Sequence, residues 1–346
     1  MEQKSKRAAL TLLTSFAVAG CGTAAAAGST SAPAKAETQT QARTQVPVPT
    51  LAQRALAAHT AAATAPECNA ILPFYWAIGD ASGKLTDAAL NTSPPLANAP
   101  TADTGMEIAS ASKLVYGAYV AEKRNGALTP DDVHFLTFVS GYTDFSYCTA
   151  DQSVADCENF GQNGQYVFRN DGKFYYGGGH MEKHAADNGL GAFQDNALAL
   201  TVNATLGTTF TYAQPQLAGG IFTTPTAYGN FLQRIVDGQL KIGPLLGTHA
   251  VCTKPDSVVC PTSASSPMTS ENDHYSIGHW VEDAPLVGDG AFSSAGAFGF
   301  YPWIDASKTW WGTVARHVVS ANEQEGINSM MCGRKIRAAW VSGNAS

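Results

Sequence analysis

The sequence has little charge and lacks several common functional signatures. Only 14% of its 346 residues are charged, against roughly 25% in an average soluble domain. The net charge is −7 and no basic cluster of nucleic-acid-binding size occurs, which argues against a nucleic-acid partner. No Gly-x-Ser-x-Gly motif is present, which argues against an α/β-hydrolase, and no Gly-Lys-Ser/Thr follows the Gly177-Gly178-Gly179 run, so this run is not a phosphate loop.

The N-terminus lacks an apolar run long enough to span a bilayer. Residues 8–20 are apolar but too short for a transmembrane helix, and they follow a basic segment at residues 4–7, as in a secretory signal peptide. The segment ends in Val-Ala-Gly-Cys at Cys21, which resembles a bacterial lipobox. That resemblance implies cleavage and lipidation at Cys21, and an ordinary secretory signal cut nearby is the alternative. Both predict an exported protein, at the periplasmic face of a membrane or at the cell surface.

Six cysteines remain beyond Cys21, and no Cys-x-x-Cys zinc spacing occurs among them. An even number of cysteines in an exported chain predicts disulfides. Two pairs bracket short polar loops and are expected to bond locally: Cys148 with Cys157, and Cys252 with Cys260. Cys68 and Cys332 remain, and their pairing would tie the two ends of the folded domain together.

The pattern along the chain predicts a signal peptide at residues 1–21, then a low-complexity tether and a first helix within residues 22–66, and a folded domain over residues 67–346. Strands are expected at residues 71–79, 84–90, 274–282, 297–304 and 308–317, and helices at residues 50–63, 228–240 and 321–341. The predicted fold class is α+β with two lobes. An antiparallel sheet flanked by helices (about 67–115 and 272–346) carries a mostly helical insert (about 116–271), and a ligand site is expected between the lobes.

The motif Ser110-Ala111-Ser112-Lys113 opens an apolar, helix-like stretch. On a helix, residues three apart share one face, so the serine hydroxyl and the lysine amine would meet within one turn. A lysine in a dry pocket loses its proton readily and can then accept the proton of a serine nucleophile. The same spacing also occurs on surface helices, where the lysine is merely solvated.

Four further segments follow this motif in a characteristic order. They are residues 125–132, residues 135–142, Phe174-Tyr175-Tyr176-Gly177-Gly178-Gly179-His180, and residues 218–225. Together they resemble the serine β-lactamase and penicillin-binding protein superfamily, in particular its class C-like branch, which includes esterases and small-peptide hydrolases. The resemblance covers about residues 67–320 and implies the fold stated above.

By this resemblance, Ser110 is the nucleophile and Lys113 the lysine beside it. Tyr176 matches the tyrosine of the family's Tyr-x-Asn motif. If the alignment is shifted by one residue, Tyr175 is the matching tyrosine instead. A phenol close to Lys113 is expected to be biased toward phenolate, so Tyr176 would be a general base that later donates to the leaving group.

The sequence departs from the family at two positions. Gly178 stands where Tyr-x-Asn has its asparagine, and Ser294-Ala295-Gly296 takes the place of the Lys-Thr-Gly or His-x-Gly motif. We assign Gly178, Ser294 and Gly296 to the substrate-binding wall, but the cation that holds a substrate carboxylate in the family is missing. The backbone N–H groups of Ser110 and Ala297 are the expected oxyanion donors.

His180 and His184 have the i, i+4 spacing of zinc ligands on a helix, but no third ligand is evident. We therefore predict no metal site. His180 is expected to line the cleft near Tyr176, and His184 to lie on the surface.

These observations predict an exported, membrane-tethered serine hydrolase that works through an acyl-serine intermediate, most simply an esterase acting on a small neutral ester or amide. The chemistry requires no cofactor, and we expect a monomer. The alternatives are a β-lactamase or D-alanyl-D-alanine carboxypeptidase, and a non-catalytic envelope binding or sensor lipoprotein of the same fold.

Overall fold

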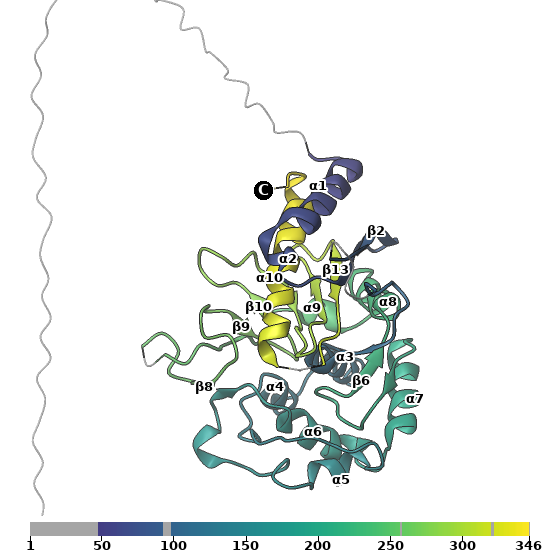
Figure 1. Cartoon of the computed structure of the whole chain (residues 1–346). Helices are drawn as coiled ribbons and strands as arrows, with labels where there is room; N and C mark the ends of the chain where they lie inside the picture. Colours follow the sequence, from purple (N-terminus) through teal and green to yellow (C-terminus); the bar gives the residue numbers. More distant parts are fainter. Residues whose placement is uncertain (1–47, 93–97, 257, 320–321, 346) are drawn as a thin grey trace, which may run out of the picture. The chain divides into compact units, whose positions relative to one another are not determined.

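The computed structural model describes residues 48–92, 98–256, 258–319 and 322–345 (Figure 1). The predicted signal peptide, Cys21 and almost all of the predicted tether lie outside the described residues. Within the described ranges, no helix combines the length and the apolar character needed to cross a membrane.

An eight-stranded sheet organises the chain, and each neighbouring pair in it is antiparallel. Its order is β2 (Gly83–Leu90), β1 (Phe74–Asp80), β13 (Trp311–Ala315), β12 (Tyr301–Ile304), β11 (Ala291–Ser293), β10 (Trp280–Glu282), β9 (His274–Tyr275) and β7 (Val251–Cys252). β1 is almost wholly buried, as its continuous apolar run predicts for a strand inside a sheet. The expected pairing of the first strands with the last one is confirmed, because β1 lies between β2 and β13.

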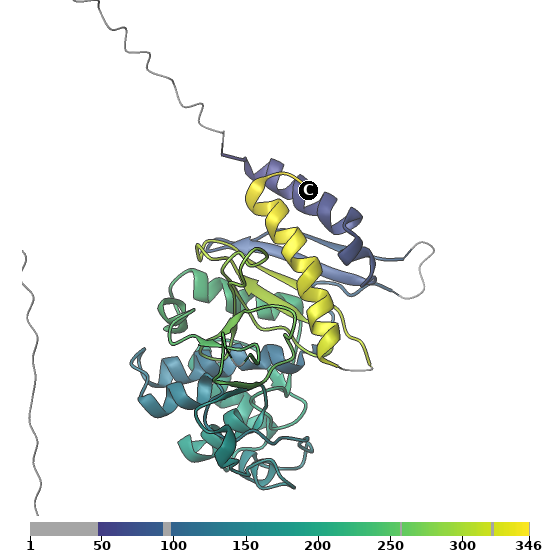
Figure 2. The same ribbon diagram turned by 90° about the vertical axis from the view of Figure 1, so that its left-hand side faces the viewer.

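Helices cover both faces of this sheet. On one face α10 (Glu323–Ser342) packs on β12 and β13, and α1 (Leu51–Thr64) lies beside α10 (Figures 1 and 2). On the other face α8 (Pro225–Val236) packs on β1 and β13. The register explains this division: Trp311 meets Gly229 of α8, whereas Val314, three residues along the strand, faces Gly333 of α10.

The buried helix α3 (Ser112–Lys123) packs against α7 and α9 of the segment between the first and last strands. The other helices are α2 (Pro66–Asn69), α4 (Pro130–Leu136), α5 (Val154–Glu158), α6 (Gly179–Ala185), α7 (Asp195–Leu206) and α9 (Ile242–Leu245), with short helical turns η1 (Ala109–Ala111), η2 (Phe168–Asn170) and η3 (Ala186–Leu190). Two small sheets complete the fold: β3 (Met106–Glu107) with β6 (Ile221–Thr223) and β5 (Thr211–Tyr212), and β4 (Phe174–Tyr175) with β8 (Ser263–Ser265). The predicted α+β class, with an antiparallel sheet flanked by helices, is confirmed.

The strands near the C-terminus differ from the sequence prediction. The run at residues 274–282 is a hairpin of β9 and β10 rather than one strand, because the chain turns at Gly278, whose φ is +71°. The three-residue strand β11 was not predicted, since so short a segment carries no readable alternation.

The three predicted disulfides are confirmed. Cys148 bonds to Cys157 and Cys252 to Cys260, each closing a short loop. Cys68 of α2 bonds to Cys332 of α10, with a Cα–Cα distance of 4.6 Å. This last bond fixes α10 to the start of the folded region.

A buried ion cluster also fixes α10 to the sheet. Glu282 of β10 is fully buried and accepts hydrogen bonds from Arg337 at 2.7 Å and from Arg334 at 2.8 Å. Arg337 also donates to Asp289 at 2.7 Å. Burial alone would raise the pKa of Glu282, but Arg337 and Arg334 lower it to about 2. The carboxylate therefore stays charged, and the helix is held in one position.

Candidate active site

Ser110 lies in η1, immediately before α3. Its neighbour Ala109 has a φ of +44°, the left-handed conformation that residues with a side chain rarely adopt. Lys113 is the second residue of α3 and lies one turn further on. Its Nζ atom is 2.7 Å from the Ser110 Oγ atom and 2.9 Å from the carbonyl oxygen of Ala218. The helical spacing predicted from the motif therefore brings the hydroxyl and the amine together.

Burial changes the protonation of Lys113. The side chain is 4% exposed, and desolvation lowers its pKa to about 8, while the charges of Glu323 and Glu182 oppose that shift. A substantial fraction of the amine is therefore neutral at mildly alkaline pH. In that form it can accept the hydroxyl proton of Ser110.

Glu182 of α6 fixes the acceptor on the far side of Lys113. Its carboxylate accepts hydrogen bonds from the backbone N–H groups of Leu217 at 3.1 Å and Ala218 at 3.0 Å. Burial raises the pKa of Glu182 to about 7, although these two N–H groups and Lys113 favour its charged form. Glu182 thereby orients the carbonyl of Ala218 toward the lysine.

Tyr176 follows β4, and Lys113 Nζ lies 5.0 Å from the centroid of its ring. The ring stacks on Trp280 at 5.3 Å. Tyr175 and Tyr176 both line the cavity into which Ser110 and Lys113 open. The ring of Tyr176 is the one that contacts Lys113, and its hydroxyl hydrogen bonds with Ser110. Ser110, Lys113 and Tyr176 therefore lie in contact with one another.

The surroundings of Tyr176 do not favour the phenolate that the sequence analysis expects. Burial, and next the negative charge of Glu323, raise the pKa of Tyr176 above its ordinary value, and hydrogen bonds with Ser110 and Trp280 only partly offset this. These surroundings favour the protonated phenol. A phenol can donate or relay a proton. Lys113, whose pKa is lowered to about 8, is the group whose neutral form can accept one.

The segment Ser294-Ala295-Gly296 runs against the Ser110 loop. Ser294 is buried and its hydroxyl donates to the carbonyl oxygen of Ser110 at 2.9 Å. A Cβ atom on Gly296 would lie 2.0 Å from the carbonyl oxygen of Ile108, so only glycine permits this approach. Neither residue lines the cavity. Ser294 thus contacts the backbone of Ser110, and Gly296 lies against the backbone of Ile108, whereas the sequence analysis expects both in the substrate-binding wall.

Beside the Ser110 hydroxyl, the backbone N–H groups of Ser110 and Ala297 are free to donate hydrogen bonds. Ser110 and Ala297 both line the cavity. Among the described residues, no backbone or side-chain acceptor occupies the N–H of either one. Two free N–H groups beside a nucleophile are what an oxyanion hole needs.

A cavity of about 830 Å³ contains this site. Its walls include Ser110, Lys113, Tyr176, Gly178 and Ala297, together with residues that sequence reasoning missed: Asp144, Phe145, Gln214, Gln216, Phe298 and Glu323. Gly178 thus faces the cavity, as expected.

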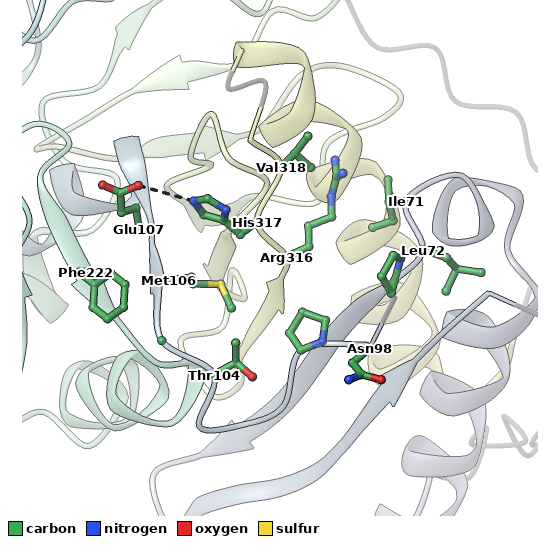
Figure 3. A pocket seen from close by; sticks show the side chains of 13 residues that line it. Ile71, Leu72, Asn98, Thr104, Met106, Glu107, Phe222, Arg316, His317 and Val318 are labelled. Carbon is green, nitrogen blue, oxygen red and sulfur yellow. Dashed lines mark ion pairs between the residues drawn. The ribbon is translucent and has the colours of Figure 1, made fainter. Parts of the chain in front are cut away.

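A second cavity, of about 600 Å³, lies beyond Phe298, which stacks on His317 at 4.7 Å. Figure 3 shows its lining, with His317 pointing at Glu107 across a gap of 3.6 Å. It contains neither Ser110 nor Lys113, both of which line the first cavity.

Solved structures share this architecture. The simvastatin synthase LovD from Aspergillus terreus matches 84% of this chain and 97% of its own, with a TM-score of 0.54 and 15% identity. A penicillin-binding protein from Bacillus halodurans matches 79% of this chain and 98% of its own, with a TM-score of 0.54 and 14% identity. An octameric penicillin-binding protein homologue from Pyrococcus abyssi matches 80% of this chain and 75% of its own, with a TM-score of 0.54 and 12% identity.

The fold is that of the serine β-lactamases and penicillin-binding proteins. The resemblance inferred from the motifs is therefore confirmed at the level of fold. No protein-family model and no curated protein matches the sequence. At these identities the shared β-lactamase fold does not define the activity, which has to be argued from the site.

Two histidines within the β-lactamase fold are placed differently from the sequence prediction. His180 does not line the cavity: it is fully buried, 2.6 Å from the Ser140 hydroxyl and 3.0 Å from the carbonyl oxygen of Tyr175. His184 is buried rather than on the surface, because it lies between the Tyr116 hydroxyl at 2.7 Å and Asp132 at 3.0 Å. In the described part of the chain no group of three or more potential ligands could hold a metal ion.

Glu323 is the least expected member of the site. It is the first residue of α10, and its charge acts on both Lys113 and Tyr176. Its position at the start of a predicted helix was readable from the sequence. That this helix end reaches Ser110 depends on tertiary packing alone.

Proposed function

We propose that this protein is an exported serine hydrolase that cleaves small esters or amides through an acyl-serine intermediate. The observation that carries the proposal is the 2.7 Å separation of Lys113 Nζ and Ser110 Oγ in the wall of a cavity large enough for a small substrate. Three disulfides and the N-terminal signal pattern support export. Lipidation at Cys21 remains part of this proposal.

In the proposed reaction, neutral Lys113 accepts the proton of Ser110 while the Ser110 oxygen bonds to the substrate carbonyl carbon. The backbone N–H groups of Ser110 and Ala297 hold the resulting oxyanion. Tyr176 donates its proton to the leaving alcohol or amine as the old bond breaks, and Lys113 returns a proton to Tyr176. Water then attacks the acyl-serine and gives its proton to Lys113. As the bond between the acyl carbon and the Ser110 oxygen breaks, Lys113 returns that proton to the Ser110 oxygen and the acid is released.

The charge of the cavity favours an ester or amide without a carboxylate. The charged side chains among its described lining residues are Lys113, Asp144 and Glu323, and Lys113 is engaged by Ser110 and Ala218. No cation is left there to hold the carboxylate of a penicillin or a D-alanyl peptide. A β-lactamase or carboxypeptidase is therefore the weaker candidate.

The test is turnover of a substrate panel by wild type and Ser110→Ala. The panel contains short- and long-chain p-nitrophenyl esters, nitrocefin and a D-alanyl dipeptide. We expect hydrolysis of the short esters, which Ser110→Ala abolishes, and little turnover of the two anionic substrates. Efficient turnover of nitrocefin would favour the β-lactamase alternative, and ester hydrolysis that survives Ser110→Ala would contradict the proposed mechanism.

A further inference from the structure

The active-site cavity carries an excess of negative charge. Asp144 and Glu323 both line it, and among the described residues neither forms an ion pair. The positive charge on the same wall is Lys113, which hydrogen bonds to Ser110 and Ala218. The two carboxylates are therefore available to a group that enters with the substrate.

Aromatic side chains lie on the same walls. Phe145, Tyr175 and Phe298 line the cavity together with Tyr176. Aromatic faces attract cations through their quadrupole, and most strongly alkylated ammonium groups, which water solvates weakly. Carboxylates combined with aromatic faces form a surface that suits an ammonium ion and repels an anion.

Glu323 lines the cavity together with Tyr176. Its negative charge raises the pKa of Tyr176, the proton donor to the leaving group in the proposed mechanism, and that of Lys113. Glu323 is exposed to the solvent that fills the cavity. The surrounding cavity wall desolvates its carboxylate in part and raises its pKa, and the charge of Lys113 opposes that shift. Because Glu323 is the first residue of the long helix α10, its carboxylate also offsets the positive end of the helix dipole, which would otherwise attract a substrate anion.

The helix that carries Glu323 is fixed in place. The Cys68–Cys332 disulfide ties α10 to α2, and Arg334 and Arg337 tie it to the buried Glu282. A charge on so rigid an element keeps its position relative to Ser110, which is what charge selection requires.

We propose that Glu323 is a specificity-determining residue that selects substrates with an ammonium group on the leaving-group side of the scissile bond. This inference deepens the proposed function and rests on it. Asp144 adds to the same negative potential, and the aromatic walls receive the alkyl groups of the cation.

A matched substrate pair tests this inference. Acetylthiocholine and 3,3-dimethylbutyl thioacetate have nearly the same shape, but only the first carries a positive charge. Hydrolysis of each is followed at pH 8 and low salt through the released thiol, with wild type, Glu323→Gln and Asp131→Asn. Asp131 is an exposed acid outside the cavity, so its variant makes the same change in net charge elsewhere.

We expect wild type and Asp131→Asn to prefer the cationic thioester by about tenfold in kcat/KM, as one charge at close range can provide at low salt. Glu323→Gln should reduce that ratio to near one, chiefly by raising KM for acetylthiocholine, and added salt should reduce it in wild type. Equal rates on the pair in wild type, or an unchanged preference in Glu323→Gln, would overturn the inference.

Labelling of Ser110 by a fluorophosphonate covers the case in which neither thioester is turned over. Choline should then slow the labelling of wild type more than 3,3-dimethylbutanol does, and lose that advantage in Glu323→Gln. Equal protection by the two alcohols in wild type would overturn the inference alone. A wild-type protein that is not labelled at Ser110 would overturn the proposed function together with it.

Discussion

Lys113 Nζ lies 2.7 Å from Ser110 Oγ and is almost completely shielded from solvent. The same burial that brings the two atoms into contact lowers the pKa of the amine to about 8. Burial therefore supplies both the contact with Ser110 and the neutral, proton-accepting form of the amine that nucleophilic catalysis needs.

The first prediction concerns pH. Because the proposed base is the neutral amine of Lys113, kcat/KM for a short neutral ester should rise with pH and level off above an inflection near 8. Initial-rate measurements of kcat/KM from pH 5 to 10 give this profile. An inflection near 6 would point instead to a histidine base, although burial lowers the pKa of the nearby His180 to about 3.

Replacement of the base gives the second prediction. Lys113→Ala should lower kcat by about 10³-fold, the usual scale for loss of a general base, while circular dichroism shows a retained fold. Lys183→Ala, which removes a lysine that pairs with Asp187 and Glu158 outside the cavity, is the control. Turnover by Lys113→Ala close to that of the control would refute the assignment.

Glu182 is expected to act as a positioning residue. Glu182→Gln removes a negative charge that raises the pKa of Lys113, so the inflection of the pH profile should move below that of wild type. The variant also disturbs the Leu217 and Ala218 N–H contacts, and kcat should fall about tenfold. A lower kcat with an unmoved inflection would leave Glu182 with a purely structural role.

The Gly296 contact predicts a separable effect on the oxyanion hole. An alanine there would press against the backbone at Ile108 and displace the adjacent Ala297 N–H. Loss of one oxyanion donor costs about 3 kcal/mol, so kcat should fall about 10²-fold or more. Gly333→Ala on α10 would instead collide with the ring of Tyr301 on β12, and should lower Tm and leave kcat intact. If both variants lose only stability, Ala297 is not a donor.

The Arg337 cluster predicts a large difference between two cations of one helix. Arg337→Met leaves Glu282 and Asp289 short of a partner and should cost about 3–5 kcal/mol of unfolding free energy. Lys335→Met breaks a half-exposed pair with Glu67 and should cost about 1 kcal/mol or less. Urea unfolding of both variants measures these values, and similar midpoints would contradict the role given to the cluster.

The same cluster predicts acid sensitivity. The folded-state pKa of Glu282 is about 2, below its ordinary value, so its stabilising contribution is present above pH 4.5 and is lost as the pH falls toward 2. The unfolding free energy of wild type should therefore decline over that range. A flat profile there would show that Glu282 is not held as a charged group.

Local patterns were the reliable part of the sequence. Ser110 and Lys113 meet because one helical turn sets their spacing. Cys148 with Cys157 and Cys252 with Cys260 each bracket a short loop and pair locally, so Cys68 is left to pair with Cys332. The order of the elements predicted that the first and last strands share one sheet, and the antiparallel pairing of β1 with β13 confirms this.

What depends on distant packing could not be predicted. The protonated state of Tyr176 follows from its burial and from Glu323, which comes from the far end of the chain. His184 was expected at the surface because nothing near it in sequence indicates that Tyr116 and Asp132 enclose it. Ser294 faces the nucleophile's backbone rather than substrate for the same reason.

The central claim is that the Ser110 oxygen is an activated nucleophile, and intact-mass measurement after exposure to a fluorophosphonate ester tests it most directly. Wild type should gain the mass of one adduct, which peptide mapping assigns to Ser110, and Ser110→Ala should gain none. An unmodified wild-type protein, or an adduct at another residue, would contradict the claim.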